Sequence, residues 1–250
     1  MPFTPVDLHA HTTFSDGVLA PAELVAAVAA RGVRPSVADH LSRDVAAAVR
    51  TVDGVRGYLD ALDELPVLRG GEFCWHDSLW RELPAELAAR FTHRIGSLHA
   101  VFLPSGERVH MFQRRLPAGL APDAYMDVHV ANLERFAAEM PVDVLAHPTL
   151  LPLPWRALPL EELWTEPREE RAVEALFRAG IAFEVSNRYR AHPRFVRRAA
   201  ARGVRLSLGS DGHTLAQVGD LAWPLALTRS LGVRDEELYD PTVHGSRTGG

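Results

Sequence analysis

The sequence predicts an α/β fold in which parallel strands alternate with helices and close, or nearly close, into a distorted barrel of seven strands. Three observations predict this. Seven short apolar segments alternate with segments of helical character, most connections are short, and no change of composition marks a second domain. Such alternation is typical of a parallel sheet, because a crossover helix brings the next strand round in the same direction. A chain of 250 residues also suits a single α/β barrel.

Apolar runs locate the strands, and helical periodicity locates the helices. The predicted strands are residues 6–8, 33–38, 67–71, 94–98, 142–146, 181–185 and 204–208. The predicted helices are residues 22–31, 43–49, 54–65, 84–90, 123–140, 166–179, 193–202 and 215–231.

Proline and glycine support several of these boundaries. Pro21 stands in the first turn of the first helix, where its missing N–H costs nothing, and Gly32 ends that helix. Gly180 and Gly203 end two later helices in the same way. Pro35 weakens the start of the second strand, because proline cannot donate to a sheet.

Composition limits the classes of function and the cellular setting. The net charge of −5 provides no basic face for long nucleic acid. Cys74 is the only cysteine, which excludes an intrachain disulfide and a thiolate zinc site. No secretion signal begins the chain and no apolar run approaches about 18 residues, so we expect a cytoplasmic protein without a membrane span. We expect one domain over residues 1–240 and a flexible tail over 241–250; the sequence leaves the oligomeric state open.

The stretch that follows the first strand carries the clearest chemical signal. His9 and His11 are two residues apart on an extended chain, so their side chains point to the same side and can bind one cation together. Asp16 follows after a turn marked by Ser15 and Gly17, close enough to serve a neighbouring cation. Imidazole and carboxylate ligands suit zinc, manganese or iron.

Further potential ligands follow the other predicted strands. They are His40, Glu72, His99, His147, Asp211 and His213. In a β/α barrel the carboxyl ends of the strands build the active site. Six of the twelve histidines stand at such positions, so we predict a metal cluster at this end of the barrel. The segments 101–121 and 150–165, rich in proline and glycine, are expected as loops near its mouth.

This pattern resembles the polymerase and histidinol phosphatase (PHP) superfamily over residues 6–213. The resemblance implies a distorted seven-stranded barrel and up to three divalent metals, which would be zinc, manganese or iron. It implies one metal bound by His9, His11, Glu72 and Asp211. It implies a second bound by Glu72, His99 and His147, and a third bound by Asp16, His40 and His213.

The implied activity is hydrolysis of a phosphate monoester. Neighbouring metals supply a hydroxide by lowering the pKa of bound water, and they offset the charge of the phosphoryl and leaving oxygens. Asp39 is expected either to orient His40 or to act only as a structural hydrogen-bond acceptor, and Arg188 is expected to clamp the phosphate. Protonation of the leaving group is assigned to a metal-bound water, Asp211 or His213, without a choice among them.

The resemblance favours a histidinol-phosphatase-like enzyme acting on a small phosphorylated substrate. The segment 94–99 resembles the corresponding piece of those enzymes, and the short spacing from Glu72 to His99 leaves no room for the insertion of nucleotide-cleaving relatives. The alternatives are a phosphoesterase acting on nucleotides or short oligonucleotides, a metal-dependent amidohydrolase, and a non-catalytic regulatory or interaction module. Against the amidohydrolase, the chain has no lysine to serve as a carboxylated bridge. Against the module, every ligand position is filled.

Overall fold

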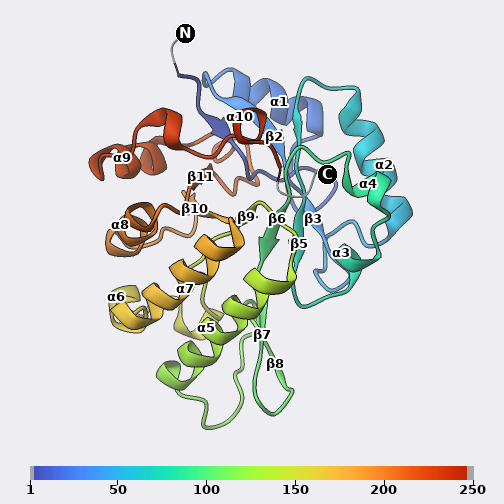
Figure 1. The fold of residues 1–250 in the computed structure, drawn as a ribbon. Coiled ribbons are helices and arrows are strands. Elements are labelled where there is room, and N and C mark those ends of the chain that lie inside the picture. Colours follow the sequence, from blue (N-terminus) through green and yellow to red (C-terminus); the bar gives the residue numbers. More distant parts are fainter. Residues whose placement is uncertain (1–2, 247–250) are drawn as a thin grey trace.

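The computed structural model describes residues 3–246 and consists of parallel strands surrounded by helices (Figure 1). One sheet has the order β1 (Val6–Asp7), β2 (Arg34–Val37) and β4 (Leu68–Arg69). The other has the order β11 (Leu206–Gly209), β10 (Ala182–Ser186), β9 (Val144–Leu145), β6 (Ile95–Ser97), β5 (Glu72–Cys74) and β3 (His40–Leu41). Every strand pair within these two sheets is parallel, as predicted.

Backbone hydrogen bonds join the two sheets at both ends. The Leu8 amide donates to the Leu208 carbonyl at 3.0 Å, which places β1 beside β11. On the other side, the Glu72 amide donates to the Asp39 carbonyl at 2.9 Å. Asp39 lies between β2 and β3, and Glu72 begins β5 shortly after β4 ends. The strands therefore form a parallel arrangement joined at both ends, while the division into seven barrel strands stays a prediction.

Helices cover the outside of the strands (Figure 1). The longer ones are α1 (Pro21–Ala29), α2 (Val52–Asp63), α5 (Pro122–Glu139), α7 (Glu166–Ala179), α8 (Pro193–Arg202) and α9 (Ala222–Ser230). The short ones are α3 (Leu79–Glu82), α4 (Ala85–Ala88), α6 (Leu160–Leu163), α10 (Pro241–His244) and the 3₁₀ turns Leu153–Trp155 and Asp235–Glu237. Within residues 3–246, no helix combines the length and hydrophobicity needed to cross a bilayer.

The apolar faces of these helices pack against the sheets and form the core. Leu24 of α1, Tyr58 and Leu62 of α2, Phe136 of α5 and Phe195 of α8 are all fully buried. Burial of such side chains is the main favourable contribution to folding. The helix positions follow from the periodicity of the sequence, because each apolar stripe needs a sheet face to cover it.

The prediction of a helix over residues 43–49 is wrong. A helix would bond the Val49 amide to the Val45 carbonyl, but this amide donates instead to the His40 carbonyl at 2.9 Å. The carbonyls of Val45 and Ala46 accept from the Arg50 guanidinium at 2.7 and 3.2 Å. Val49 thus pairs with β3 rather than with its own segment, which follows a path of bends.

Two other segments differ from expectation. Part of residues 101–121 is an antiparallel hairpin of β7 (Ala100–Phe102) and β8 (Arg108–His110), which projects from one end of the molecule in Figure 1. The last predicted helix, 215–231, is shorter as α9. The helix α10 covers the start of the segment expected as a flexible tail, and residues 247–250 lie outside the described residues.

Asp7 joins β1 to the segment that follows β11. Its Oδ1 accepts a hydrogen bond from the Ser210 amide at 2.8 Å. Its Oδ2 accepts from the Ser210 hydroxyl at 2.6 Å and from the Gly219 amide at 2.8 Å. The carboxylate is fully buried, so these donors replace the water that it loses on folding.

Replacing Asp7 by asparagine should destabilise the protein by about 3 kcal/mol, because an amide nitrogen would face buried donors that it cannot accept from. Urea unfolding of the chelator-treated protein measures the change. Asp53→Asn, at an exposed position in α2, is the matched control and should change stability by less than about 0.5 kcal/mol. Equal midpoints for the two variants would contradict the structural role of Asp7.

Candidate metal centre

The structure brings the nine predicted residues together at the carboxyl ends of the strands. One group of atoms has nearly equal spacing: Nε2 of His99 lies 3.3 Å from Nε2 of His147, and Oε1 of Glu72 lies 3.3 and 3.1 Å from them. Ligands at about 2.0–2.1 Å from a tetrahedral zinc lie about 3.3 Å from one another. These three atoms therefore have the spacing of one face of a zinc tetrahedron.

A second group surrounds the other oxygen of Glu72. Nε2 of His9 lies 3.1 Å from Nε2 of His11 and 3.5 Å from Oε2 of Glu72. Nε2 of His11 lies 3.5 Å from Oδ1 of Asp211. Because Glu72 directs one oxygen to each group, its carboxylate can bridge two cations.

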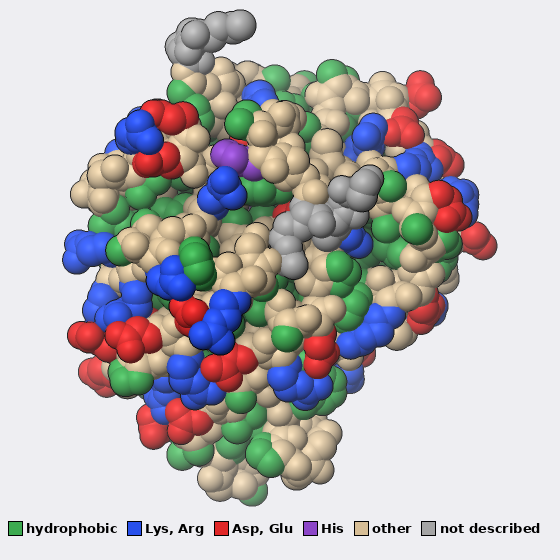
Figure 2. Space-filling model, viewed as in Figure 1, with side chains coloured by type: hydrophobic (Ala, Val, Ile, Leu, Met, Phe, Trp, Pro, Cys, Tyr) green, Lys and Arg blue, Asp and Glu red, His purple; other side chains and the backbone are tan. Residues whose placement is uncertain are grey.

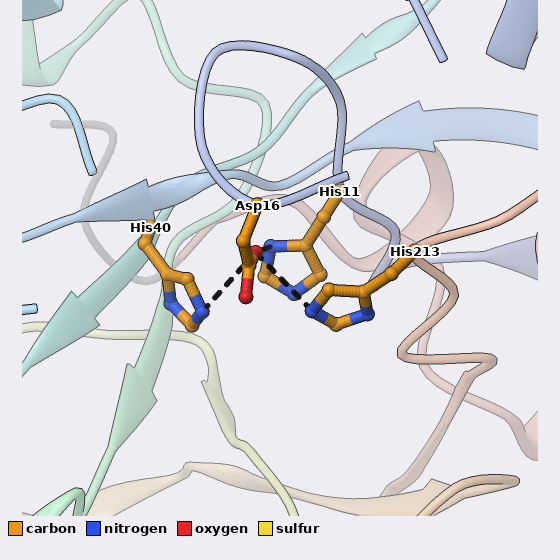
Figure 3. A group of neighbouring side chains, drawn as sticks. All are labelled: His11, Asp16, His40 and His213. Atoms are coloured by element: carbon orange, nitrogen blue, oxygen red, sulfur yellow. Dashed lines mark ion pairs between the residues drawn. The ribbon is translucent and has the colours of Figure 1, made fainter. Parts of the chain in front are cut away.

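The third group converges on Asp16 (Figure 3). Oδ1 of Asp16 lies 3.2 Å from Nε2 of His213 and 3.6 Å from Nε2 of His40. Nδ1 of His11 lies 3.7 Å from the same oxygen. His11 thus stands between the second and third groups, with one ring nitrogen toward each.

The protonation states suit a set of cation ligands. Burial would raise the pKa of Glu72, but the neighbouring imidazoles, His40 first among them, lower it well below its usual value. Burial lowers the pKa of His11 to about 3 and also lowers the pKa of His99. The centre therefore combines the ionised Glu72 carboxylate with neutral imidazoles at His11 and His99, and such groups are donors that transition metals bind.

One contact shows that the cluster is not satisfied by hydrogen bonds alone. Nδ1 of His40 and Oε2 of Glu72 lie 2.6 Å apart, but neither atom has a partner in hydrogen-bond geometry among the described residues. In the absence of a cation, Glu72 raises the pKa of His40 to about 10 despite burial. A proton on this ring thus partly balances the carboxylate, which a divalent cation would balance more fully. The residues present fit such a cation.

Two of the nine residues have a backbone conformation that is unusual for their type. The φ angles of His147 and Asp211 are +30° and +50°, in the left-handed region that side chains disfavour. The Asp211 amide donates to the His9 carbonyl at 2.8 Å, which fixes this conformation against the first strand. Strain of this kind persists where surrounding contacts over-determine it, and it gathers at functional sites.

Glu184 of β10 is a further residue of the centre to which the sequence analysis assigned no role. It is buried, and its Oε1 lies 2.8 Å from Nδ1 of His9. Its Oε2 accepts a hydrogen bond of 2.5 Å from the His147 amide. Gly209 provides the space for this carboxylate, because a Cβ at position 209 would lie 2.1 Å from Oε1 of Glu184. A lone glutamate in an otherwise apolar strand is the signal in the sequence that marks it.

The expectation that Asp39 orients His40 is wrong. The Asp39 oxygens instead accept hydrogen bonds from the amide and hydroxyl of Thr12, both at 2.7 Å, and from the Ser15 hydroxyl at 2.5 Å. Asp39 therefore fixes the loop that carries Asp16.

Cys74 lies in the core and also contacts the centre. Its Sγ lies 3.1 Å from Nδ1 of His99 and is fully buried. The thiol therefore helps to set the orientation of that imidazole ring.

Arg188 lies beside the third group. Its Nη1 lies 2.6 Å from Nδ1 of His213. Arg156, Tyr189 and Arg190 contribute with it to the lining of an adjacent pocket of about 180 Å³. The guanidinium of Arg156 lies over the Tyr189 ring, 5.4 Å from its centroid. The mouth of the centre is therefore positively charged and partly aromatic.

Comparisons with known proteins give the fold. No protein-family model and no curated protein sequence matches the chain. A solved structure of a Listeria monocytogenes protein assigned as a histidinol phosphatase is similar at a TM-score of 0.69 and 14% identity, covering 86% of this chain and 97% of that one. The histidinol phosphate phosphatase of Lactococcus lactis subsp. lactis, solved with zinc, L-histidinol and phosphate, is similar at a TM-score of 0.65 and 13% identity, covering 95% of each chain.

These two structures define the class of fold. The chain has the α/β fold of solved histidinol phosphatases over nearly its whole length. Identities of 14 and 13% show this fold and carry no conclusion about superfamily or activity.

Glu184→Gln should weaken zinc binding by about 10- to 100-fold, the usual cost of losing a partner that orients a metal ligand. The amide would place a donor against either His9 or the His147 amide. Competition with a chromophoric chelator measures the affinity, and the exposed Glu64→Gln is the matched control. Unchanged zinc affinity in Glu184→Gln would show that other contacts orient the two histidines.

Proposed function

We propose that this chain is a metal-dependent phosphatase that hydrolyses a small phosphate monoester, with histidinol phosphate as the first substrate to test. The observation that carries the proposal is the cluster of nine imidazole and carboxylate side chains in three adjoining groups, seven of them buried. The fold it shares with a phosphatase solved with zinc, L-histidinol and phosphate supports it.

The three groups would hold up to three divalent cations, zinc among them. The sets are His9, His11, Glu72 and Asp211; Glu72, His99 and His147; and Asp16, His40 and His213. When bound, such cations lower the pKa of a bound water and offset the charge of phosphoryl oxygens. The residues of the chain fix the cations and exclude bulk water, because most of these side chains are buried.

Arg188 and Asp211 have separate roles in the proposal. Arg188 projects beside His213, where its guanidinium can hold a phosphoryl oxygen with charge-assisted hydrogen bonds. Burial would raise the pKa of Asp211, but the hydrogen bond from His11 and nearby imidazoles lower it. An ionised Asp211 argues against this residue as the proton donor, which leaves His213 or a water.

The distribution of charge favours a small substrate. On the face of the molecule drawn in Figure 2, arginine and acidic side chains are interspersed, without a continuous basic stripe. A chain of net charge −5 does not attract a long polyanion. The negative charge of a substrate is instead compensated by the arginines that line the pocket beside the centre.

That pocket also favours a second candidate, a phosphoesterase acting on a mononucleotide or short oligonucleotide. Arg156, Arg188 and Arg190 contribute three guanidinium groups to a cavity of about 180 Å³, and Tyr189 adds an aromatic ring. A substrate with a second phosphate and a base would use both features, whereas the amine of histidinol phosphate is cationic.

Zinc- or manganese-reconstituted protein should release phosphate from L-histidinol phosphate, and His9→Ala should lose at least about 100-fold in kcat/KM, because the cation cluster is incomplete. A 3′,5′-bisphosphonucleotide is the competing substrate. Release only from the nucleotide would overturn the substrate and retain the chemistry. No release from either, or from a broad phosphoester panel, with metals bound, would favour a non-catalytic module.

Arg188→Ala should lower kcat/KM for the active phosphoester by about 10- to 100-fold, the value of one charge-assisted contact to phosphate. Arg178→Ala is the matched control, since that side chain is exposed on α7 and pairs with acidic Glu174 on its own helix. Equal kinetics in the two variants would contradict the assignment of Arg188.

A further inference from the structure

A second group of potential metal ligands lies apart from the nine-residue cluster. It consists of Asp44, His76 and His110, whose ligand atoms all lie within 4.8 Å of one another. Asp44 belongs to the bent segment after β3, His76 follows β5, and His110 ends β8. Three segments that are distant in sequence thus converge at one point beside the β7–β8 hairpin.

The potential ligand atoms of this group make few hydrogen bonds. Nε2 of His76 lies 3.0 Å from Oδ2 of Asp44, and the His110 ring stands edge-on to the His76 ring at 5.5 Å. The His76 side chain is fully buried, and its Nδ1 has no hydrogen-bond partner among the described residues. His110 accepts one long bond of 3.3 Å from the Phe112 amide.

Both rings are neutral at neutral pH. Burial lowers the pKa of His110 to about 4 and lowers the pKa of His76. Neutral imidazoles have the free lone pair that a metal requires, and together with a carboxylate they form a three-ligand set of the kind zinc binds with water in the fourth position. The rings therefore offer ligands rather than positive charges.

The Asp44 carboxylate already has a cationic partner in Arg108. Nη1 of Arg108 is 2.8 Å from Oδ2 of Asp44, the same oxygen that faces His76. The Arg108 side chain is 41% exposed, so it can turn to solvent at small cost. Arg108 thus stands as a competitor for the position of a cation.

We propose that Asp44, His76 and His110 form a separate mononuclear site for zinc or a similar divalent cation, in which the metal replaces Arg108 as the partner of Asp44. The 3.0 Å between His76 and Asp44 is already close to the about 3.3 Å between ligands of a tetrahedral zinc, whereas the whole group spans up to 4.8 Å. Completing the site needs movement of the half-buried His110 ring and the exposed Asp44, while the buried His76 stays in place.

The site would attach the β7–β8 hairpin to the body of the molecule. Phe112, two residues after His110, contacts the His99 ring at 5.6 Å and lies under the Arg156 guanidinium at 4.8 Å. A cation that fixes His110 therefore also fixes the chain that leads to the mouth of the main centre. The site does not depend on the activity proposed for that centre.

Counting bound zinc tests the proposal. Wild-type protein is stripped with a chelator, dialysed against buffered free zinc, and its zinc content measured by mass spectrometry alongside three variants. His110→Ala removes a ligand, Arg108→Gln removes the competing charge, and His244→Ala removes a histidine that lies outside both sites. Circular dichroism checks that each variant is folded.

We expect wild type and His244→Ala to bind one more zinc per chain than His110→Ala. Arg108→Gln should bind that additional zinc about two- to fivefold more tightly, corresponding to loss of an exposed ion pair. Equal zinc content in wild type and His110→Ala would overturn the site. A lower zinc affinity in Arg108→Gln would also overturn it, because it would show that the arginine does not compete with the metal.

Discussion

The arrangement of the centre depends on one buried carboxylate, that of Glu72. Its side chain is fully buried, and five imidazoles lie 2.6 to 3.8 Å from its oxygens. An uncompensated buried charge costs several kcal/mol, so the carboxylate requires positive charge close by. Protons on neighbouring rings supply part of it, and divalent cations bound through the imidazole lone pairs would supply more.

The backbone is built to hold this carboxylate in place. Short parallel strands deliver side chains to one end of the molecule, and Asp7 and Glu184 connect the first strand to those that come last in the sequence. His147 and Asp211 adopt left-handed φ angles that bring their side chains inward. The surrounding contacts therefore offset the free-energy cost of these strained backbone angles.

The same fold leaves the choice of substrate to the loops at the mouth. Arg188, Arg156 and Tyr189 come from connections rather than strands, and the β7–β8 hairpin brings Phe112 beside His99. A likeness to solved structures at 13 and 14% identity shows the fold alone, so it does not identify what these loops bind.

The sequence by itself determined the parallel α/β class, most helices, and the nine residues that meet in the centre, because strand ends of a parallel fold share one side and apolar periodicity locates the strands. It did not determine the segment 43–49, where the Val49 amide donates to the His40 carbonyl instead of to a carbonyl within a helix. Nor did it determine the partners of Asp39, the role of Glu184, or the meeting of Asp44 with His76 and His110. Those contacts join residues far apart in the chain, and only tertiary packing decides which buried polar group satisfies which.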